Sequence, residues 1–443
     1  MRIKNFIILF GLLVSGLLVN AQSGIIKFEE YDLDNGLHVI LQQDKSTPIV
    51  AVTTMYHVGS KNEIPNRTGF AHLFEHLMFE GTDNIPRGKF SEIVEKAGGT
   101  LNANTSSDRT FYYELLPSNQ LELGIWLESE RMLHAKIDSI GIATQKDVVI
   151  EEKKQSYDNR PYGSILIEIM KRSFKKHPYQ WTTIGDPKHI RAASDEYIKS
   201  FYNDFYVPNN AVVTICGDID IDETKKLVEK YYSDIPKSEK EIYRPNIVEP
   251  TRNKEIRDTI YDNVQLPAVI QSYNIPAMGT ADYYAVQMLS TLLSGGQSSR
   301  LYKSLVDNKQ LALQAMSFPF PLEDPGVALV FALPNMGVDP MKMETAMNLE
   351  IEKTRNELIS DEEMQKLKNQ FENDIVSKNT TIAERATNLA TKYTYFKDAS
   401  LVNSELEKYL AVTKEDIKRV ATKYFKPENR VVLYYLPKQN SKK

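Results

Sequence analysis

The sequence is poor in cysteine. Its 443 residues include only Cys216, so no disulfide can form within the chain, and the folded state must be stabilised by buried apolar surface and hydrogen bonds. Cys216 lies in the apolar run AVVTICGD, which predicts a buried strand. A lone cysteine in such a run behaves as a small hydrophobic residue, so we expect no catalytic thiol there.

The sequence also lacks a basic excess and, beyond its first residues, any long apolar run. It carries 54 lysines and arginines against 59 aspartates and glutamates, a formal net charge of −5, and no basic cluster that would bind nucleic-acid phosphates. A membrane-spanning helix needs about 20 apolar residues, and no run after the N-terminus reaches that length. With 42% hydrophobic residues, the chain is typical of a soluble globular protein large enough for two cores.

The first 21 residues have the order of a secretory signal. Arg2 and Lys4 precede an apolar stretch from Phe6 to Val19, and the small residue Ala21 follows, which predicts cleavage after Ala21. The alternative is a retained membrane anchor, but the apolar stretch is shorter than a span, and no cysteine follows it to carry a lipid. The sequence therefore predicts an exported protein, periplasmic or extracellular, without a stable membrane span after signal removal.

Strand and helix patterns alternate along the rest of the chain. The turn at 34–36 reads Asp-Asn-Gly and separates two extended runs, and Asn-Gly is a strong hairpin signal. A strand is expected over 49–57, and two more over TLNANT and TFYYELL, which lie between helical periodicity around 90–97 and around 120–134. This mixture of antiparallel strands and helices predicts the α+β class.

The chain contains an internal repeat. The segment 194–213 aligns without a gap on the segment 413–432, with seven identical positions, and each copy predicts an amphipathic helix, a Pro-Asn turn and a β-branched strand. We interpret the chain as two tandem homologous domains, each a mainly antiparallel sheet packed with helices. The proline-bearing, charged segment 235–258 has the composition of a linker. The predicted domains are therefore 22–240 and 241–443, after a signal at 1–21.

Two of the seven histidines lie within one helical turn, in HLFEH at 72–76. The surrounding run GFAHLFEHLMFEG is apolar on almost all sides of the helix, which predicts burial, so His72, Glu75 and His76 need polar partners. Positions i, i+3 and i+4 share a helix face, where both imidazoles can bind one tetrahedral ion while the carboxylate reaches a water on it. Chance would produce HxxEH on the order of 0.01 times in this chain. The alternative is a pair of hydrogen-bonded core histidines.

A catalytic zinc site usually has a third protein ligand, and the helix in TQKDVVIEEKKQSYDN offers one. Val148 and Val149 are expected to mark its buried face, which Glu152 shares and Glu151 does not. Taken alone, a Glu-Glu pair on a helix is usually a solvated face. Gln145, seven residues before Glu152, lies on the same face and is expected to support the ligands. The predicted ligands of one Zn²⁺ per chain are His72, His76 and Glu152.

The order HxxEH, followed further along by a glutamate in DVVIEE, resembles that of the inverzincin metallopeptidases pitrilysin, insulysin and the mitochondrial processing peptidase. The likeness covers nearly the whole chain after the signal and is greatest to the short bacterial processing-peptidase-like subunits. It implies a zinc metalloendopeptidase that hydrolyses peptides or unfolded segments, with Glu75 as general base. Many relatives have a glutamate where Gln145 stands, which implies a changed strength of activity.

The resemblance extends to the segments that bind substrate. GGTLNANTSSDRTFYYE resembles the family's edge strand and its neighbour, which implies that Asn102, Ala103 and Asn104 bind an extended peptide, and LLSGGQSSRLYKSL resembles a substrate-contacting region, here Arg300 and Tyr302. Family members enclose a chamber with four related domains. A chain with two implies a homodimer or a heterodimer with a related subunit. The alternative function is a non-enzymatic or weakly active scaffold or peptide-binding subunit of a heterodimeric peptidase.

Overall fold

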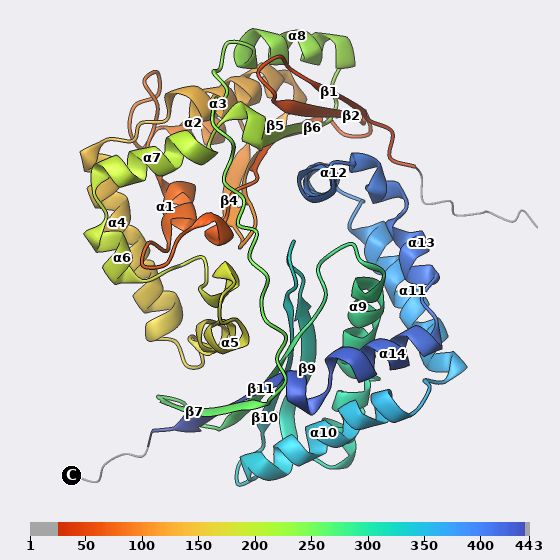
Figure 1. Cartoon of the computed structure of the whole chain (residues 1–443). Helices are drawn as coiled ribbons and strands as arrows, with labels where there is room; N and C mark the ends of the chain where they lie inside the picture. The colour runs from red at the N-terminus through yellow and green to blue at the C-terminus, as the bar shows by residue number, and fades with distance from the viewer. Residues whose placement is uncertain (1–24, 439–443) are drawn as a thin grey trace, which may run out of the picture.

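The computed structural model describes residues 25–438 and contains two β-sheets (Figure 1). The sheet of the first half has the strand order β1-β2-β6-β3-β5-β4, and the sheet of the second half has the order β7-β11-β8-β10-β9. Neighbouring strands are antiparallel except in the pairs β2–β6 and β7–β11. The strands are β1 (Glu29–Asp32), β2 (His38–Gln43), β3 (Ile49–Tyr56), β4 (Thr100–Thr105), β5 (Thr110–Pro117), β6 (Ala211–Gly217), β7 (Ile256–Asp262), β8 (Ala268–Asn274), β9 (Ala312–Phe320), β10 (Val327–Pro334) and β11 (Arg430–Pro437).

Helices cover both sheets, which confirms the prediction of two related α+β units with mainly antiparallel sheets. One face of the first sheet packs against α1, α3, α7 and α8, and one face of the second packs against α9, α10 and α14. The helices are α1 (Phe70–Leu77), α2 (Phe90–Lys96), α3 (Leu121–His134), α4 (Ser139–Lys153), α5 (Ile165–Ser173), α6 (Pro187–Ala192), α7 (Asp195–Phe205), α8 (Ile221–Tyr232), α9 (Ala281–Ser294), α10 (Pro340–Asn356), α11 (Asp361–Ser377), α12 (Ile382–Phe396), α13 (Glu405–Leu410) and α14 (Lys414–Tyr424).

The internal repeat corresponds to equivalent units at the end of each half. Helix α7, a turn at Pro208–Asn210 and strand β6 form the first unit, and α14, a turn at Pro427–Asn429 and β11 form the second. In each turn the asparagine side chain donates to the carbonyl five residues earlier, Asn210 to Phe205 at 2.7 Å and Asn429 to Tyr424 at 2.8 Å. The shared Pro-x-Asn pattern therefore closes the helix and starts the strand in the same way in both halves.

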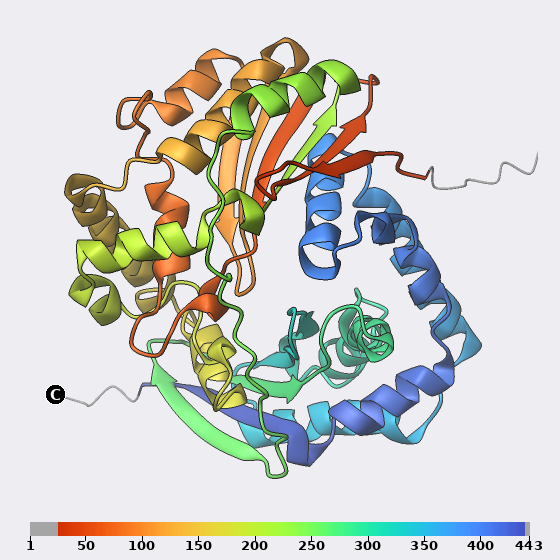
Figure 2. The ribbon, with the colours of Figure 1, turned by 45° about the horizontal axis from the view of Figure 1, so that its top comes forward.

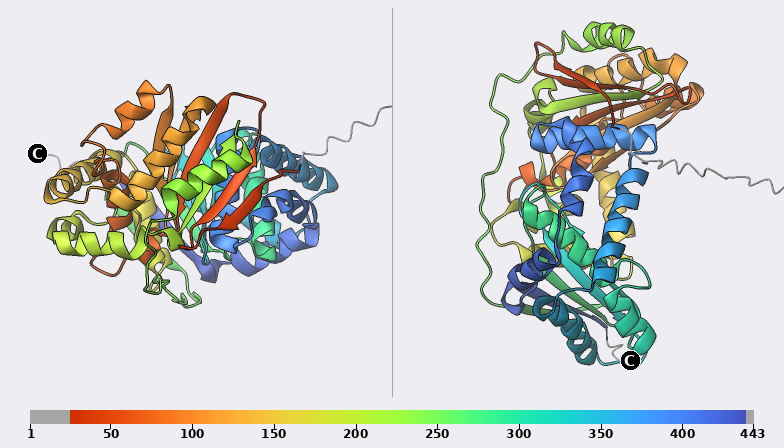
Figure 3. Two further views of the ribbon diagram at one scale, coloured as in Figure 1. Left: turned by 90° about the horizontal axis from the view of Figure 1, so that it is seen from above. Right: turned by 90° about the vertical axis from the view of Figure 1, so that its right-hand side faces the viewer.

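The two halves exchange helices. Helix α12 of the second half packs on the second face of the first sheet, where Ala386 and Leu389 join a core with Ile40 and Val212 (Figures 2 and 3). Helix α5 of the first half packs in turn on the second face of the second sheet, where its apolar residues join a core with Ile270, Leu433 and others. Each sheet is thus buried on both faces, and one of its covers comes from the other half.

The linker runs along the outside of both halves (Figure 3, right). Residues 236–255 form neither helix nor strand, and the predicted domain boundary near residue 240 falls among them but stays a prediction. The predicted signal, 1–21, lies outside the described residues. No helix within residues 25–438 combines the length and apolar character of a membrane span.

One expectation about α4 is wrong. Val148 was expected on the buried face, but its side chain is 42% exposed, whereas Val149 is fully buried. The two residues are consecutive and point about 100° apart around the helix axis, and the core accepts only Val149. Glu152, three residues after Val149, still faces inward, while Glu151 is exposed and pairs with Lys154.

Candidate metal centre

Helix α1 carries His72, Glu75 and His76 and is fixed at its N-terminus by a residue outside it. The N-cap, Gly69, has φ of 94° and no side chain to cap the helix. The buried carboxyl group of Glu63 accepts from the backbone N–H of Gly69 and of Ala71, each at 2.9 Å. Burial raises the pKa of Glu63 to about 8. At the other end, the Tyr112 hydroxyl donates to the Phe74 carbonyl at 3.0 Å. Side chains therefore hold both ends of the helix in place.

The side chains of His72, His76 and Glu152 converge, and each offers a ligand atom within 4.8 Å of the others. Glu152 Oε2 lies 3.6 Å from His72 Nε2 and 3.3 Å from His76 Nε2. Burial lowers the pKa of His72, and the contact with His76 lowers the pKa of Glu152. Both shifts favour the unprotonated ligand forms, neutral imidazole and carboxylate, that bind a divalent metal.

Glu75 lies on the same helix face and contacts the edge of the first sheet. Its Oε2 accepts a hydrogen bond of 2.6 Å from the hydroxyl of Thr105, the last residue of β4. This bond occupies one oxygen of the carboxylate and leaves the other free to accept a proton. The bond also ties the candidate general base to the strand expected to bind substrate.

Gln145 is held by a carboxylate that the sequence analysis did not identify. The Gln145 amide donates to Glu80 Oε1 at 2.5 Å, and Glu80 is 7% exposed. Arg87 pairs with the other oxygen of Glu80 and also contacts Asp138 at 2.7 Å. A carboxylate therefore remains beside position 145, although it comes from the α1 side and not from α4.

The residues expected to bind substrate lie in two places. Asn102 and Asn104 are exposed on β4, and Ala103 is 9% exposed. Among residues 25–438, β5 is the one sheet neighbour of β4, so β4 is an edge strand of the described sheet. Arg300 and Tyr302 lie in the second half, between α9 and β9. The Arg300 guanidinium makes two hydrogen bonds of 2.8 Å to Glu363 of α11, so its charge is already paired within the chain. The substrate-binding roles of all five residues stay predictions.

Comparisons with known proteins identify the family. Residues 38–186 match a family model described as insulinase (peptidase family M16), and residues 192–371 match one described as peptidase M16 inactive domain. The zinc protease PqqE of Helicobacter pylori is 32% identical over 429 residues, which cover 96% of each chain. The chain belongs to peptidase family M16. The M16 relatives include further proteins named as zinc proteases, one of them from Bacillus subtilis at 24% identity over 68% of this chain and 73% of that protein.

Solved M16 structures share the fold. The crystal structure of a protease from Helicobacter pylori has a TM-score of 0.89 at 31% identity, over 93% of this chain and 100% of that chain. The periplasmic protease PqqL from Escherichia coli has a TM-score of 0.75 at 18% identity and shows the same fold. This chain covers 47% of PqqL, so PqqL is about twice as long as the matched unit.

Three residues of the site, Glu63, Glu80 and Thr105, were not predicted from the sequence. Glu63 lies in a loop and Thr105 at the end of a strand. Their contacts with α1 leave no periodic pattern in the sequence that could predict them. Glu80 lies four residues after His76 in HLMFE, a spacing that places two residues on one face when the helix continues, although α1 ends at Leu77. It could have been proposed as a supporting carboxylate together with Gln145.

Proposed function

We propose that the chain is a zinc-dependent endopeptidase in which His72, His76 and Glu152 hold one Zn²⁺ and Glu75 is the general base. The observation that carries the proposal is the spacing of the three ligand atoms. Ligands bound tetrahedrally at about 2.1 Å lie about 3.4 Å from one another, and the distances from Glu152 Oε2 to the two imidazole nitrogens are 3.3 and 3.6 Å. The donor set of two imidazoles and one carboxylate also suits zinc and leaves a fourth position open.

Each group of the proposed site has a separate role in peptide hydrolysis. Zinc, when bound, would polarise the scissile carbonyl and lower the pKa of a water molecule. Glu75 accepts the proton of the attacking water on its free oxygen and passes it to the leaving amine. Thr105 holds the other oxygen through the 2.6 Å bond, which fixes the direction of the free one. Burial lowers the pKa of His72, which favours the neutral imidazole that can bind metal.

The substrate is proposed to be a peptide or an unfolded segment in extended form. Strand β4 offers a free backbone edge beside Glu75, and an added strand would satisfy its N–H and C=O groups. The Ala103 N–H donates to the neighbouring Asn102 side chain at 2.8 Å, a local bond that a substrate carbonyl would replace. A folded protein cannot present such a strand without local unfolding.

The active form is proposed to be a dimer, exported to the periplasm or the cell exterior. PqqL, a periplasmic protease, is about twice as long as the part that this chain matches, and we propose that a second related chain here supplies the other half of an enclosing chamber. In a homodimer, Arg300 and Tyr302 of one subunit would face the other subunit's metal, which requires Arg300 to leave Glu363. Native mass spectrometry of the protein expressed alone separates the cases: an inactive monomer that becomes active with a related subunit indicates a heterodimer.

Paired variants test the metal site. Glu75→Gln should keep stoichiometric zinc and lose turnover, because the amide cannot accept the proton. Glu152→Gln should lose zinc, whereas Glu151→Gln, at the adjacent exposed position, should keep both zinc and activity. Zinc content by elemental analysis and chelator-sensitive cleavage of a mixed peptide library are the measurements. Equal zinc content in Glu152→Gln and Glu151→Gln would refute the ligand assignment.

A second candidate function is a weakly active or non-enzymatic peptide-binding subunit. It is favoured by the amide at Gln145. The model described as an inactive domain matches residues 192–371, which contain none of the proposed zinc ligands, so that match does not bear on the metal site. A protein that binds peptides but contains less than stoichiometric zinc and shows no chelator-sensitive cleavage would favour this function over the peptidase.

A further inference from the structure

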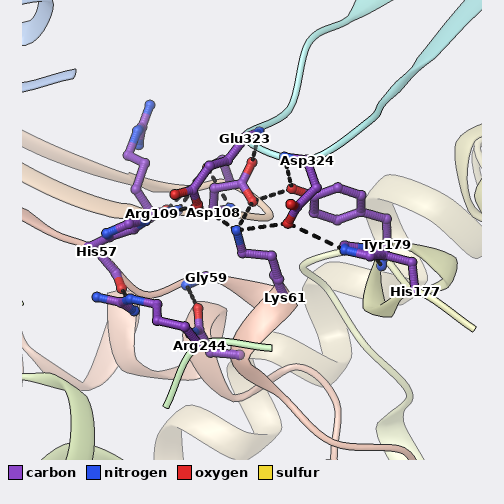
Figure 4. Close-up of polar contacts among 12 residues, drawn as sticks. His57, Gly59, Lys61, Asp108, Arg109, His177, Tyr179, Arg244, Glu323 and Asp324 are labelled. Carbon is purple, nitrogen blue, oxygen red and sulfur yellow. Dashed lines mark hydrogen bonds and ion pairs between the residues drawn. The ribbon is translucent and has the colours of Figure 1, made fainter. Parts of the chain in front are cut away.

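The second half of the chain reaches the first through the loop 321–326 between β9 and β10. This loop carries Glu323 and Asp324 to the ammonium of Lys61 (Figure 4). Asp324 Oδ2 lies 3.2 Å from Lys61 Nζ, and Glu323 is closer still. His57 Nε2 lies 2.9 Å from Glu323 Oε2, and His177 Nε2 lies 3.3 Å from Asp324 Oδ2. Both acids therefore have a partner in the first half besides Lys61.

A third carboxylate, Asp108, connects this cluster to the turn between β4 and β5. Asp108 is 2% exposed, and its Oδ1 lies 3.2 Å from Lys61 Nζ and accepts from the Tyr179 hydroxyl at 2.5 Å. The backbone N–H of Glu323 donates to Asp108 Oδ2 at 3.1 Å. Lys61 thus joins two carboxylates of the second half to one in the turn, and the loop backbone bonds the turn directly.

The turn between β4 and β5 directly follows Thr105, the residue that bonds Glu75. Thr105 ends β4, and the turn 106–109 follows immediately. The Lys61 N–H donates to the Ser107 carbonyl at 2.8 Å, so Lys61 holds the turn through its backbone as well as through its side chain. At Gly59 the chain passes so close that a Cβ would lie 2.5 Å from the Ser107 carbonyl. This close approach leaves the turn little freedom to move independently of residues 59–61.

We propose that Lys61 and Asp108 are positioning residues through which the loop 321–326 of the second half fixes the turn, and with it Thr105, relative to Glu75. Neither residue touches the reacting atoms; both act through the place of Thr105. The inference rests on the proposed role of Glu75 as general base. It assigns the second half a part in catalysis within its own chain, separate from any contribution to a partner.

A matched pair of variants tests the proposal. Glu323→Gln removes the charge that faces Lys61 and His57 while it keeps the size of the side chain. Asp44→Asn is the control. Asp44 pairs with Arg385 of α12, so this pair also joins the two halves. The exposed fraction of the Asp44 side chain, 24%, is similar to that of Glu323, 25%. Asp44 lies far from the turn 106–109. It follows β2 and bonds Gly217, beside the start of β3, whereas the turn lies beside the end of β3.

We expect Glu323→Gln to lower kcat by about tenfold with little change in KM, because small displacements of a catalytic group are costly. Amide hydrogen exchange should become faster at Lys61 and Arg109, which bond within the turn region, and stay unchanged in β6. Asp44→Asn should change neither kcat nor exchange at the turn, and zinc content should be equal in all three proteins.

Equal losses of kcat in the two variants, or parental kcat and parental exchange at the turn in Glu323→Gln, would overturn the proposal. If the parent protein shows no chelator-sensitive peptidase activity, the proposed function fails instead. The exchange measurement then still decides whether the loop fixes the turn.

Discussion

The buried carboxyl group of Glu63 makes the stability of the metal helix depend on pH. Its pKa is raised by burial from 4.5 in the unfolded chain to about 8 in the folded protein. Between these values the folded state binds more protons than the unfolded state, so the free energy of unfolding falls as pH rises through this range. The separation corresponds to at most about 5 kcal/mol, and because the side chain is 2% exposed, solvent screens little of it.

Glu63→Gln should remove this dependence. The glutamine oxygen can accept from one of the two helix N–H groups, but its NH₂ faces the other, which costs on the order of 1–3 kcal/mol. We therefore expect the variant to be less stable than the parent at pH 5 by about that amount. The parent loses the contribution of Glu63 as the pH rises, whereas the variant has no such contribution to lose, so the difference between them should vanish or reverse near pH 8.5.

The assay is urea unfolding of the metal-free protein in the presence of a chelator, so that pH-dependent metal binding does not contribute. The urea midpoint is measured by circular dichroism between pH 5 and pH 8.5 for the parent, Glu63→Gln and Glu95→Gln. Glu95 is an exposed glutamate of α2, and its variant should follow the parent. If the difference in midpoint between Glu63→Gln and the parent is the same at every pH, the reasoning about Glu63 is refuted.

Two further substitutions test buried charges. Gln145→Glu should lower the thermal midpoint at pH 8 more than at pH 5, because it sets a second carboxylate against Glu80. The double variant Gln145→Glu/Glu80→Gln exchanges the amide and the carboxylate and should restore the parental midpoint. A single variant Gln145→Glu as stable as the parent at pH 8 would contradict this. Arg131→Met should lower the free energy of unfolding by about 3–5 kcal/mol, because Glu114 and Glu128 lie 3.3 and 3.0 Å from its guanidinium with all three side chains fully buried. A loss below about 1 kcal/mol in urea unfolding would contradict this prediction.

Local signals predicted the elements that local chemistry determines. The Asn-Gly turn at 35–36 produces the β1–β2 hairpin, with Gly36 at φ of 80°, and the spacing of His72, Glu75 and His76 places them on one face of α1. Helix periodicity also selected Glu152 over Glu151, although the reason given through Val148 was wrong. These features depend on residues within about two helical turns of one another.

Contacts between distant segments could not be predicted in this way. Lys61 meets Glu323 across 262 residues, and neither the run GSKNE nor the run PLEDP has a pattern that identifies the other. Glu63 likewise caps α1 from a loop, where no helical period applies. Such contacts depend on how the two sheets are placed, and that placement is set by the apolar faces of α5 and α12.

Because the two halves exchange α5 and α12, the linker between them does not separate two independently stable units. A proline-bearing, charged segment normally separates units that fold alone, and the composition of 235–258 suggests such a division. Yet a chain cut near residue 240 would leave Ile40, Ala51 and Val212 without α12, and Ile270 and Leu433 without α5. Each sheet would then expose an apolar face that monomeric proteins rarely tolerate. The halves are therefore related by sequence and topology but interdependent in stability, and the position of the loop 321–326 beside Lys61 follows from that interdependence.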